Sequence, residues 1–240
     1  MSSGSIWQEV ECGGYAGDLG AWEELALVAG GPILELGSGT GRVALHLARR
    51  GHEVWGVDAD PDLVAGLSHA AESGRLDVRA VCGDARDLSL DREFALVIAP
   101  MQLLQILGGP DGRAAALAGS AAHLRGGGLL AAAIVEDAPS HLPSPGPQVP
   151  DVREADGWVY ASRTLGAAVV EDRIEVRRLR QAVSPDGELT EDGHTDTLDV
   201  LCAATLEAEA AAAGLCPAKR VEVPPVDGNA GSTVVVLERA

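Results

Sequence analysis

The sequence predicts an α/β fold: a doubly wound, mostly parallel sheet of seven strands, with an antiparallel strand insertion after the fifth. Between residues 33 and 135, short apolar runs alternate with helical segments, an order that implies right-handed crossovers between parallel strands. Residues 94–99 read Phe-Ala-Leu-Val-Ile-Ala, which is typical of a strand covered on both faces. The first apolar run ends in the glycine-rich turn Gly37-Ser38-Gly39-Thr40-Gly41.

The elements up to residue 135 follow from apolar periodicity and from residues that start or stop helices. Residues 1–31 form an N-terminal helical segment, in which Trp22–Ala29 is helical with Asp18 as its N-cap. The five predicted strands are 33–36, 53–57, 78–81, 94–99 and 129–135. The helices between them are 43–50, 61–71 and 111–124. Asp60 and Pro61 suit the N-cap and first position of the second helix, and Gly126–Gly128 should end the third.

The character of the sequence changes after residue 136. Five prolines fall between residues 137 and 150, which predicts a loop or lid rather than regular structure. Four strands are expected at 158–164, 167–171, 173–184 and 189–198, with a turn at Asp186-Gly187. A helix at 205–213 and two strands at 220–223 and 233–237, joined around Asp227-Gly228, complete the chain. We therefore expect one domain over residues 1–240, with residues 137–200 as an insertion.

The composition of the chain disfavours several classes of binding partner. The formal net charge is −18, and a field of that sign repels nucleic acids and anionic membrane surfaces. No apolar run approaches the length of a membrane span, and the N-terminus has no basic segment followed by an apolar one. The scattered positions of Cys12, Cys82, Cys202 and Cys216 favour reduced thiols and no metal site. We expect a cytoplasmic protein that binds neither nucleic acid nor membrane.

The glycine turn and one downstream carboxylate predict a nucleoside site. Asp58 ends the second apolar run, seventeen positions after Gly41. Glycines let a backbone approach a ligand closely, and a carboxylate at the end of the second strand binds ribose hydroxyls. Asp84 and Pro100 likewise follow predicted strands. Because ligands in such sheets lie beyond the carboxyl ends of the strands, these residues should converge on one crevice.

Two residues near the turn indicate which nucleoside is bound. Loops that bind dinucleotides have a later glycine, in the order G-x-G-x-x-G, and Arg42 stands in that place here. Glu35, just before the turn, would repel a pyrophosphate but suits an ammonium group. Ribose hydroxyls, an amino group and no phosphate describe S-adenosylmethionine (SAM). The run from Glu35 to Gly41 resembles the first motif of the class I SAM-dependent methyltransferases, close to Glu-x-Gly-x-Gly-x-Gly.

The resemblance implies a Rossmann-like fold whose last strand is antiparallel, and it implies cofactor contacts. The glycines would line the methionine and ribose portions, Glu35 would contact the amino group, and Asp58 would bind the ribose. Asp84 would contact the adenine, and Tyr15 would either lie over the cofactor or serve in packing. The cofactor-binding residues implied are Tyr15, Glu35, Gly37, Ser38, Gly39, Gly41, Asp58, Ala59, Asp84, Ala85 and Pro100. The inserted strands would cover the substrate or, alternatively, form a homodimer interface.

Three residues are candidates for the catalytic chemistry. Methyl transfer from a sulfonium is an in-line displacement governed by orientation, and it needs a general base only if the acceptor arrives protonated. His194 lies on an inserted strand and could be the base, orient the substrate or serve only in the strand. Gln102 follows the fourth strand and would face the transfer site or cap the next turn. Glu136 ends the fifth strand.

The predicted function is SAM-dependent methyl transfer to a small molecule. After the fourth strand the chain reads Ala99-Pro100-Met101-Gln102, without the Asp/Asn-Pro-Pro-aromatic motif of enzymes that methylate DNA bases or protein glutamine. One alternative is a nicotinamide-dependent oxidoreductase, which Arg42 and the lack of a Tyr-x-x-x-Lys pair oppose. The other is a SAM-binding protein without catalysis, because the residues identify no essential base.

Overall fold

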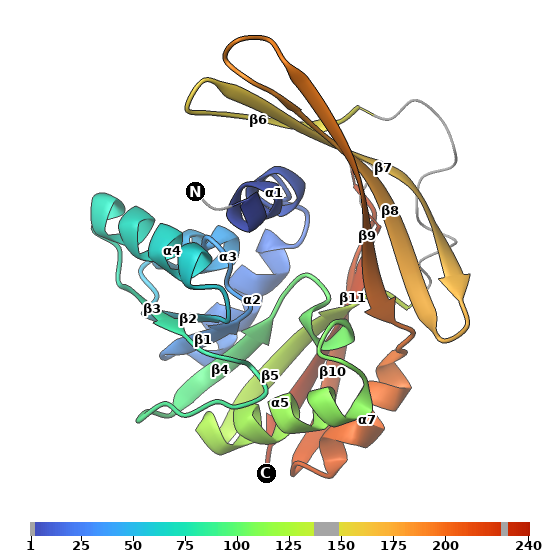
Figure 1. Cartoon of the computed structure of the whole chain (residues 1–240). Helices are drawn as coiled ribbons and strands as arrows, with labels where there is room; N and C mark the ends of the chain where they lie inside the picture. The colour runs from blue at the N-terminus through green and yellow to red at the C-terminus, as the bar shows by residue number, and fades with distance from the viewer. Residues whose placement is uncertain (1–2, 137–148, 227–229) are drawn as a thin grey trace.

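A computed structural model of the chain describes residues 3–136, 149–226 and 230–240. Its central sheet has seven strands in the order β10-β11-β5-β4-β1-β2-β3 (Figure 1). The strands are β1 (Ile33–Leu36), β2 (Val54–Asp58), β3 (Val78–Cys82), β4 (Phe94–Ala99), β5 (Leu124–Ile134), β10 (Leu215–Val223) and β11 (Ser232–Arg239). Strands β1 to β5 are parallel, and β11 runs antiparallel to both β5 and β10. The predicted mostly parallel, seven-stranded sheet with its antiparallel last strand is confirmed.

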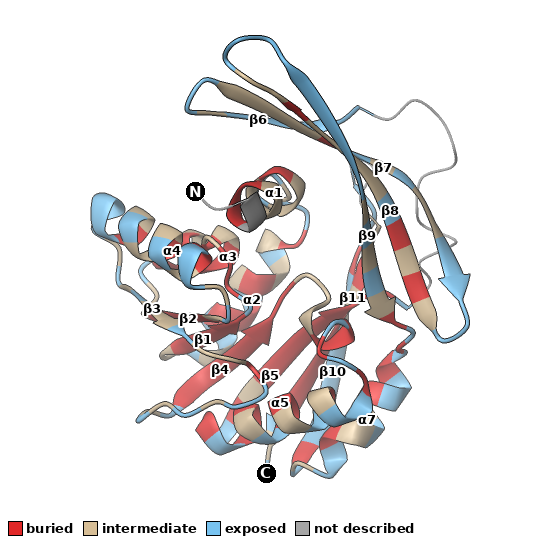
Figure 2. Ribbon diagram, in the orientation of Figure 1, coloured by how far each residue is buried: buried red, intermediate tan, exposed pale blue. Residues whose placement is uncertain are grey.

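Helices cover both faces of this sheet. The helices α2 (Leu19–Ala29), α3 (Arg42–Ala48) and α4 (Pro61–Gly74) pack on one face, and α5 (Pro110–His123) and α7 (Ala203–Ala211) pack on the other. All six residues of β4 are buried, as the red central strands of Figure 2 show. Within the described residues, no helix combines the length and the apolar character needed to span a membrane.

The insertion after β5 forms a separate antiparallel sheet, called here the second sheet. It consists of β6 (Asp151–Ala155), β7 (Trp158–Val170), β8 (Arg173–Val183) and β9 (Leu189–Asp199) in that order. The second sheet arches above the central sheet, and helix α1 (Ser3–Cys12) lies beneath β6 and β7 (Figure 1). The predicted antiparallel insertion is therefore confirmed, although β7 continues through the predicted break at a bulge between Thr164 and Gly166.

Several local predictions need correction or lie outside the described residues. Strand β6 was not predicted, and the predicted N-terminal helical segment (1–31) did not single out α1 as a separate helix, because both elements pack against distant parts of the chain. Gly126–Gly128 do not separate helix from strand but belong to β5. Asp18 precedes α2 but makes no capping hydrogen bond. Most of the predicted lid (137–148) and the turn at Asp227-Gly228 lie outside the described residues.

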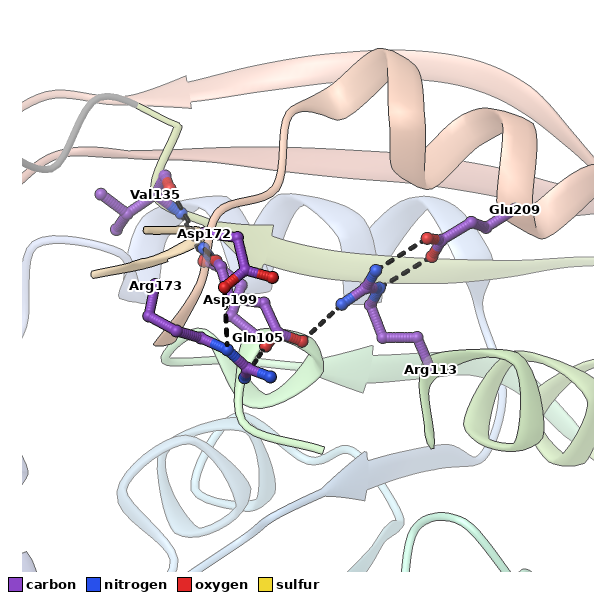
Figure 3. A network of polar contacts seen from close by, with 7 residues as sticks. All are labelled: Gln105, Arg113, Val135, Asp172, Arg173, Asp199 and Glu209. Atoms are coloured by element: carbon purple, nitrogen blue, oxygen red, sulfur yellow. Dashed lines mark hydrogen bonds and ion pairs between the residues drawn. The ribbon is translucent and has the colours of Figure 1, made fainter. Parts of the chain in front are cut away.

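Gln105 joins three chain segments where the second sheet leaves the core (Figure 3). This residue ends the short helix η1 (Leu103–Gln105) and is fully buried. Its Nε2 donates to the carbonyl of Val135 at 3.2 Å and to that of Asp199 at 2.8 Å. Its Oε1 accepts from the amide of Val135 at 2.8 Å. Because Val135 follows β5 and Asp199 ends β9, one side chain fastens both ends of the insertion.

Arg113 of α5 reinforces the same junction (Figure 3). Its guanidinium donates to Asp199 at 2.6 Å, and to Glu209 of α7 at 2.8 and 2.7 Å. Arg173, near the start of β8, also pairs with Asp199. Arg113 and Asp199 are buried, only 4% and 6% exposed. The second sheet is thus fixed to the core by charge-assisted hydrogen bonds, which are stronger than neutral ones.

Candidate functional site

A cavity of about 370 Å³ opens at the carboxyl ends of β1, β2 and β4. This is the edge at which doubly wound sheets bind ligands. Many of the residues predicted from sequence line it: Gly37, Gly39, Asp58, Ala59, Asp84, Ala85 and Pro100. Four others, Tyr15, Glu35, Ser38 and Gly41, are not among its lining residues. The predicted convergence of strand ends on one crevice is therefore observed.

The glycine turn forms a backbone cradle at this cavity. Gly37, Gly39 and Gly41 have φ angles of 63°, 54° and 97°, in the left-handed region that side chains other than glycine rarely adopt. A Cβ atom on Gly37 would lie 2.9 Å from Leu103 Cδ1, and one on Gly39 would collide with the side-chain amide of Gln8. Glycine is therefore required at both positions, because a side chain would strain the backbone and displace Leu103 and Gln8, which line the cavity.

Asp58 fixes the shape of the cradle. Its Oδ2 accepts a hydrogen bond from the amide of Gly39 at 2.8 Å, and its Oδ1 accepts from the amide of Asp60 at 2.9 Å. A carboxylate has about four lone-pair sites, so acceptor capacity remains for hydroxyl donors in the cavity. The geometry therefore fits a ligand with ribose hydroxyls.

Two buried polar atoms beside the turn lack partners in the described part of the chain. They are Oε2 of Glu35 and Oγ of Ser38, on residues only 2% and 3% exposed. Burial raises the pKa of Glu35 to about 8, while Arg42 and the amide of Ala44 act in the opposite direction. Because buried polar groups are nearly always paired, the one unpartnered oxygen of this carboxyl, next to the turn, fits a ligand that brings an ammonium group.

Arg42 occupies the place of the missing glycine and has a structural role there. It donates to Asp18 at 2.5 and 2.8 Å and to the carbonyl of Tyr15 at 2.9 Å. Its guanidinium carbon lies 5.3 Å from the centre of the Tyr15 ring. The Asp18 carboxylate also accepts from Trp22 Nε1 at 2.8 Å, which explains why it does not cap α2. Arg42 thus fastens the N-terminal segment beside the glycine turn.

At the cavity rim, the Asp84 carboxylate is paired with the guanidinium of Arg86. Arg86 Nε donates to both Asp84 oxygens at 2.9 and 3.1 Å, and Arg86 Nη2 donates to Oδ2 at 2.6 Å. The pair lowers the pKa of Asp84 to about 2. The carboxylate is therefore ionised near neutral pH and available only as a hydrogen-bond acceptor.

The three catalytic candidates are not gathered in this cavity. Glu136 Oε1 accepts from the amide of Ala203 at 2.5 Å at the start of α7, and it lines a second cavity of about 340 Å³. Gln102 has a left-handed φ of 59° and directly follows Met101, a lining residue. His194 lies on β9, where its Nε2 is 3.1 Å from Asp196 Oδ1.

The side chain of His194 lies on the face of the second sheet that α1 contacts. It pairs across the strands with Arg178, and Arg178 Nε donates to Asp196 Oδ2 at 2.9 Å. Side chains two apart on a strand lie on the same face, so Arg180 shares this face. Arg180 contacts Glu11 of α1. The His194–Asp196 pair therefore faces the side of the sheet that covers the core.

Sequence reasoning missed several lining residues. The apolar ones after β4 are Met101, Leu103, Ile106 and Leu107, and their position after a strand of the predicted crevice was a usable signal. Arg86 follows β3 in the same way. Gln8 comes from α1, and no local signal marks it, because it reaches the cavity only through the tertiary position of the helix.

Residues 33–128 match the family model of the methyltransferase domain. A 23S rRNA (uracil(747)-C(5))-methyltransferase of Pyrococcus abyssi is 37% identical over 71 residues, which are 30% of this chain and 17% of that protein. The chain spans less than half the length of the curated relatives that it matches.

Solved structures resemble the whole chain. CalS10, an amino pentose methyltransferase from Micromonospora echinaspora solved with SAM bound, has a TM-score of 0.73 at 22% identity, covering 98% of this chain and 97% of that one. The sugar N-methyltransferase KedS8 from Streptoalloteichus has a TM-score of 0.74 at 20% identity, covering 100% and 94%. These likenesses establish the fold.

Proposed function

We propose that this chain transfers the methyl group of SAM to a small molecule. Its residues 33–128 match a methyltransferase domain, and its fold is that of the class I SAM-dependent methyltransferases. The observation that carries the proposal is the glycine cradle held by Asp58 at the 370 Å³ cavity. When bound, SAM supplies an electrophilic methyl group on a sulfonium.

Each proposed contact matches the chemistry of one part of the cofactor. Asp58 accepts hydrogen bonds from the ribose hydroxyls, and the ionised carboxylate of Glu35 holds the amino group. Asp84 accepts from the adenine amino group beside Ala59 and Ala85. The turn amides and Pro100 line the remaining surface. The unpartnered Glu35 oxygen and the lining positions of Asp58 and Asp84 support these assignments.

We further propose an amine on a sugar-containing molecule as the acceptor, covered by the second sheet. A formal net charge of −18 attracts a cationic amine. CalS10 and KedS8, which have this fold, act on an amino pentose and a sugar nitrogen. An amine that arrives protonated must lose a proton before it attacks the methyl carbon. His194, held by Asp196 at 3.1 Å, is the proposed acceptor of that proton.

The acidic charge favours a small molecule over RNA as substrate, despite the short match to an rRNA methyltransferase. A cytoplasmic location is proposed from the four cysteines, none of which forms a disulfide. The alternative role of the second sheet is a homodimer interface; light scattering of the full chain measures its mass, and a monomer would exclude that alternative.

Turnover tests the function as a whole. The protein is incubated with SAM and matched pairs of sugars that differ only in bearing an amine or a hydroxyl, and S-adenosylhomocysteine (SAH) is quantified by mass spectrometry. The proposal predicts SAH with an amino sugar and none with its hydroxyl counterpart. Cofactor binding without turnover across the panel would favour the non-catalytic alternative.

Replacing His194 by alanine should separate acceptor chemistry from cofactor binding. We expect the affinity for SAH to stay within about twofold, because His194 is not among the residues that line the cofactor cavity. Turnover of a protonated amine should fall by about 10²–10⁴-fold, the usual contribution of a general base. Calorimetry and initial rates measure the two effects. A large loss of SAH affinity would place the histidine in the cofactor site instead.

Cofactor binding should release a proton near neutral pH. Burial raises the pKa of Glu35 from its usual value of 4.5 to about 8, so the carboxyl is neutral in the free protein and must ionise to hold an ammonium group. SAH affinity should therefore rise between about pH 6 and 8. Calorimetry at about pH 7 in two buffers of different ionisation enthalpy measures the released proton. Equal heats in both buffers would contradict this assignment.

The Glu35 carboxyl also makes the folding stability fall as pH rises. Glu35 ionises near 4.5 in the unfolded chain and near 8 in the folded one, so its contribution to stability is lost as pH rises between these values. In the Glu35→Gln variant, both the proton release and this pH dependence should disappear.

A further inference from the structure

One side of helix α1 contacts the glycine turn. Gln8 lines the 370 Å³ cavity, and its amide occupies the space next to Gly39 that a side chain would fill. The Thr40 hydroxyl of the turn lies 3.4 Å from Gln8 Oε1 and also donates to the carboxylate of Glu9. These contacts place the Gln8 amide directly over the cradle.

With its other side, α1 is tied to the second sheet by a shielded ion pair. Arg180 of β8 donates to the two oxygens of Glu11 at 2.7 and 2.8 Å, and the Ser162 hydroxyl of β7 donates to the same carboxylate at 2.7 Å. The side chains of Glu11 and Arg180 are only 7% and 14% exposed. A bidentate pair of this kind fixes orientation as well as distance.

Aromatic packing strengthens this attachment. The Arg180 guanidinium carbon lies 5.3 Å from the centre of the Trp7 ring. Trp7 in turn meets Tyr160 of β7 edge to face, with 5.6 Å between ring centres. Arg153 of β6 adds a more exposed pair with Glu9 at 2.8 Å. The helix is therefore joined to β6, β7 and β8, whereas its polar contact with the glycine turn runs through Thr40.

We propose that Arg180 and Glu11 are positioning residues for the cofactor: their ion pair holds α1 against the second sheet and so holds Gln8 over the glycine turn. This inference rests on the proposed function. Through this ion pair the second sheet contributes to cofactor affinity, although no residue of the second sheet is among those lining the cavity. Because coupling between sites is reciprocal, the bound cofactor should also stabilise the sheet that covers the acceptor.

Calorimetry of the full chain with SAH tests this coupling. Arg180→Met should weaken binding by about tenfold, a change that corresponds to about 1.4 kcal/mol, and Arg180→Lys should lie between Arg180→Met and the wild type. Arg177→Met is the matched control: Arg177 is exposed on the same strand and its side chain points to the opposite face. The control should bind SAH within about twofold of the wild type. Equal affinity of Arg180→Met and Arg177→Met would overturn the proposal.

Hydrogen exchange gives a second readout that a merely structural role would not produce. In the wild type, SAH should slow amide exchange in α1, β7 and β8 as well as in the glycine turn. In Arg180→Met, or in the milder Glu11→Gln variant, protection should remain in the turn and disappear from β7 and β8. Protection of all these elements in both variants would contradict the coupling. A wild type that binds no SAH would instead remove the proposed function itself.

Discussion

Replacing Asp58 by alanine is expected to weaken SAH binding by about 1.5–3 kcal/mol, or roughly 10- to 150-fold. The side chain has two roles that the substitution removes together. It accepts from the amide of Gly39 at 2.8 Å and so shapes the cradle, and it faces the cavity where it would accept from the ribose hydroxyls. Calorimetric titration of the variant with SAH measures the loss.

Asp60, two residues along the chain, provides the matched control. Its side chain accepts from the amide of Asp62 at 2.8 Å and caps α4. Its contact with Asp58 is through the backbone amide, which Asp60→Ala retains. We expect this variant to lose about 1 kcal/mol of folding stability and none of its SAH affinity. Unchanged affinity in Asp58→Ala, or an equal loss in both variants, would disprove the ribose assignment.

Arg113→Met is expected to lower the free energy of unfolding by about 1.5–3 kcal/mol, the scale of lost hydrogen bonds to charged groups. The substitution leaves Asp199, which is 6% exposed, without its contact at 2.6 Å and removes both bonds to Glu209. Asp199 keeps its ion pair with Arg173, whose side chain is 41% exposed, so the cost is that of a buried carboxylate that loses its shielded partner. Urea unfolding at about pH 7, followed by circular dichroism, measures the change.

Arg220 is the comparison for that effect. It also forms a two-bonded pair, with Glu207 at 2.8 and 2.7 Å, but its side chain is 45% exposed. Water screens such a pair, so Arg220→Met should leave the urea midpoint almost unchanged. If the two variants unfold at the same urea concentration, the junction in Figure 3 does not hold the second sheet.

The parts of the fold predicted from sequence are those encoded locally. The all-apolar run of β4 matches the structure residue for residue, because a strand buried on both faces leaves no polar interruption. Asp60 and Pro61 start α4 as expected. The glycine turn and Asp58 were predictable because a motif fixes both residue type and spacing.

What could not be predicted depends on contacts between distant residues. Glu11 and Arg180 are 169 positions apart in the chain, and Arg113 and Asp199 are 86 apart. No periodicity connects such positions. Gln8 reaches the cavity only because this packing holds α1 in place. Glu136 was expected near the chemistry from its position at the end of β5, but its carboxylate binds the start of α7 instead.

The measurement that tests the central claim most directly is calorimetric titration of the purified protein with SAH, with NADH as the comparison ligand. The Asp58-bound glycine turn and the ammonium-compatible Glu35 predict micromolar binding of SAH and no binding of NADH. Binding of NADH alone would contradict the cofactor assignment and support the oxidoreductase. Binding of neither ligand would contradict a SAM site at this cavity.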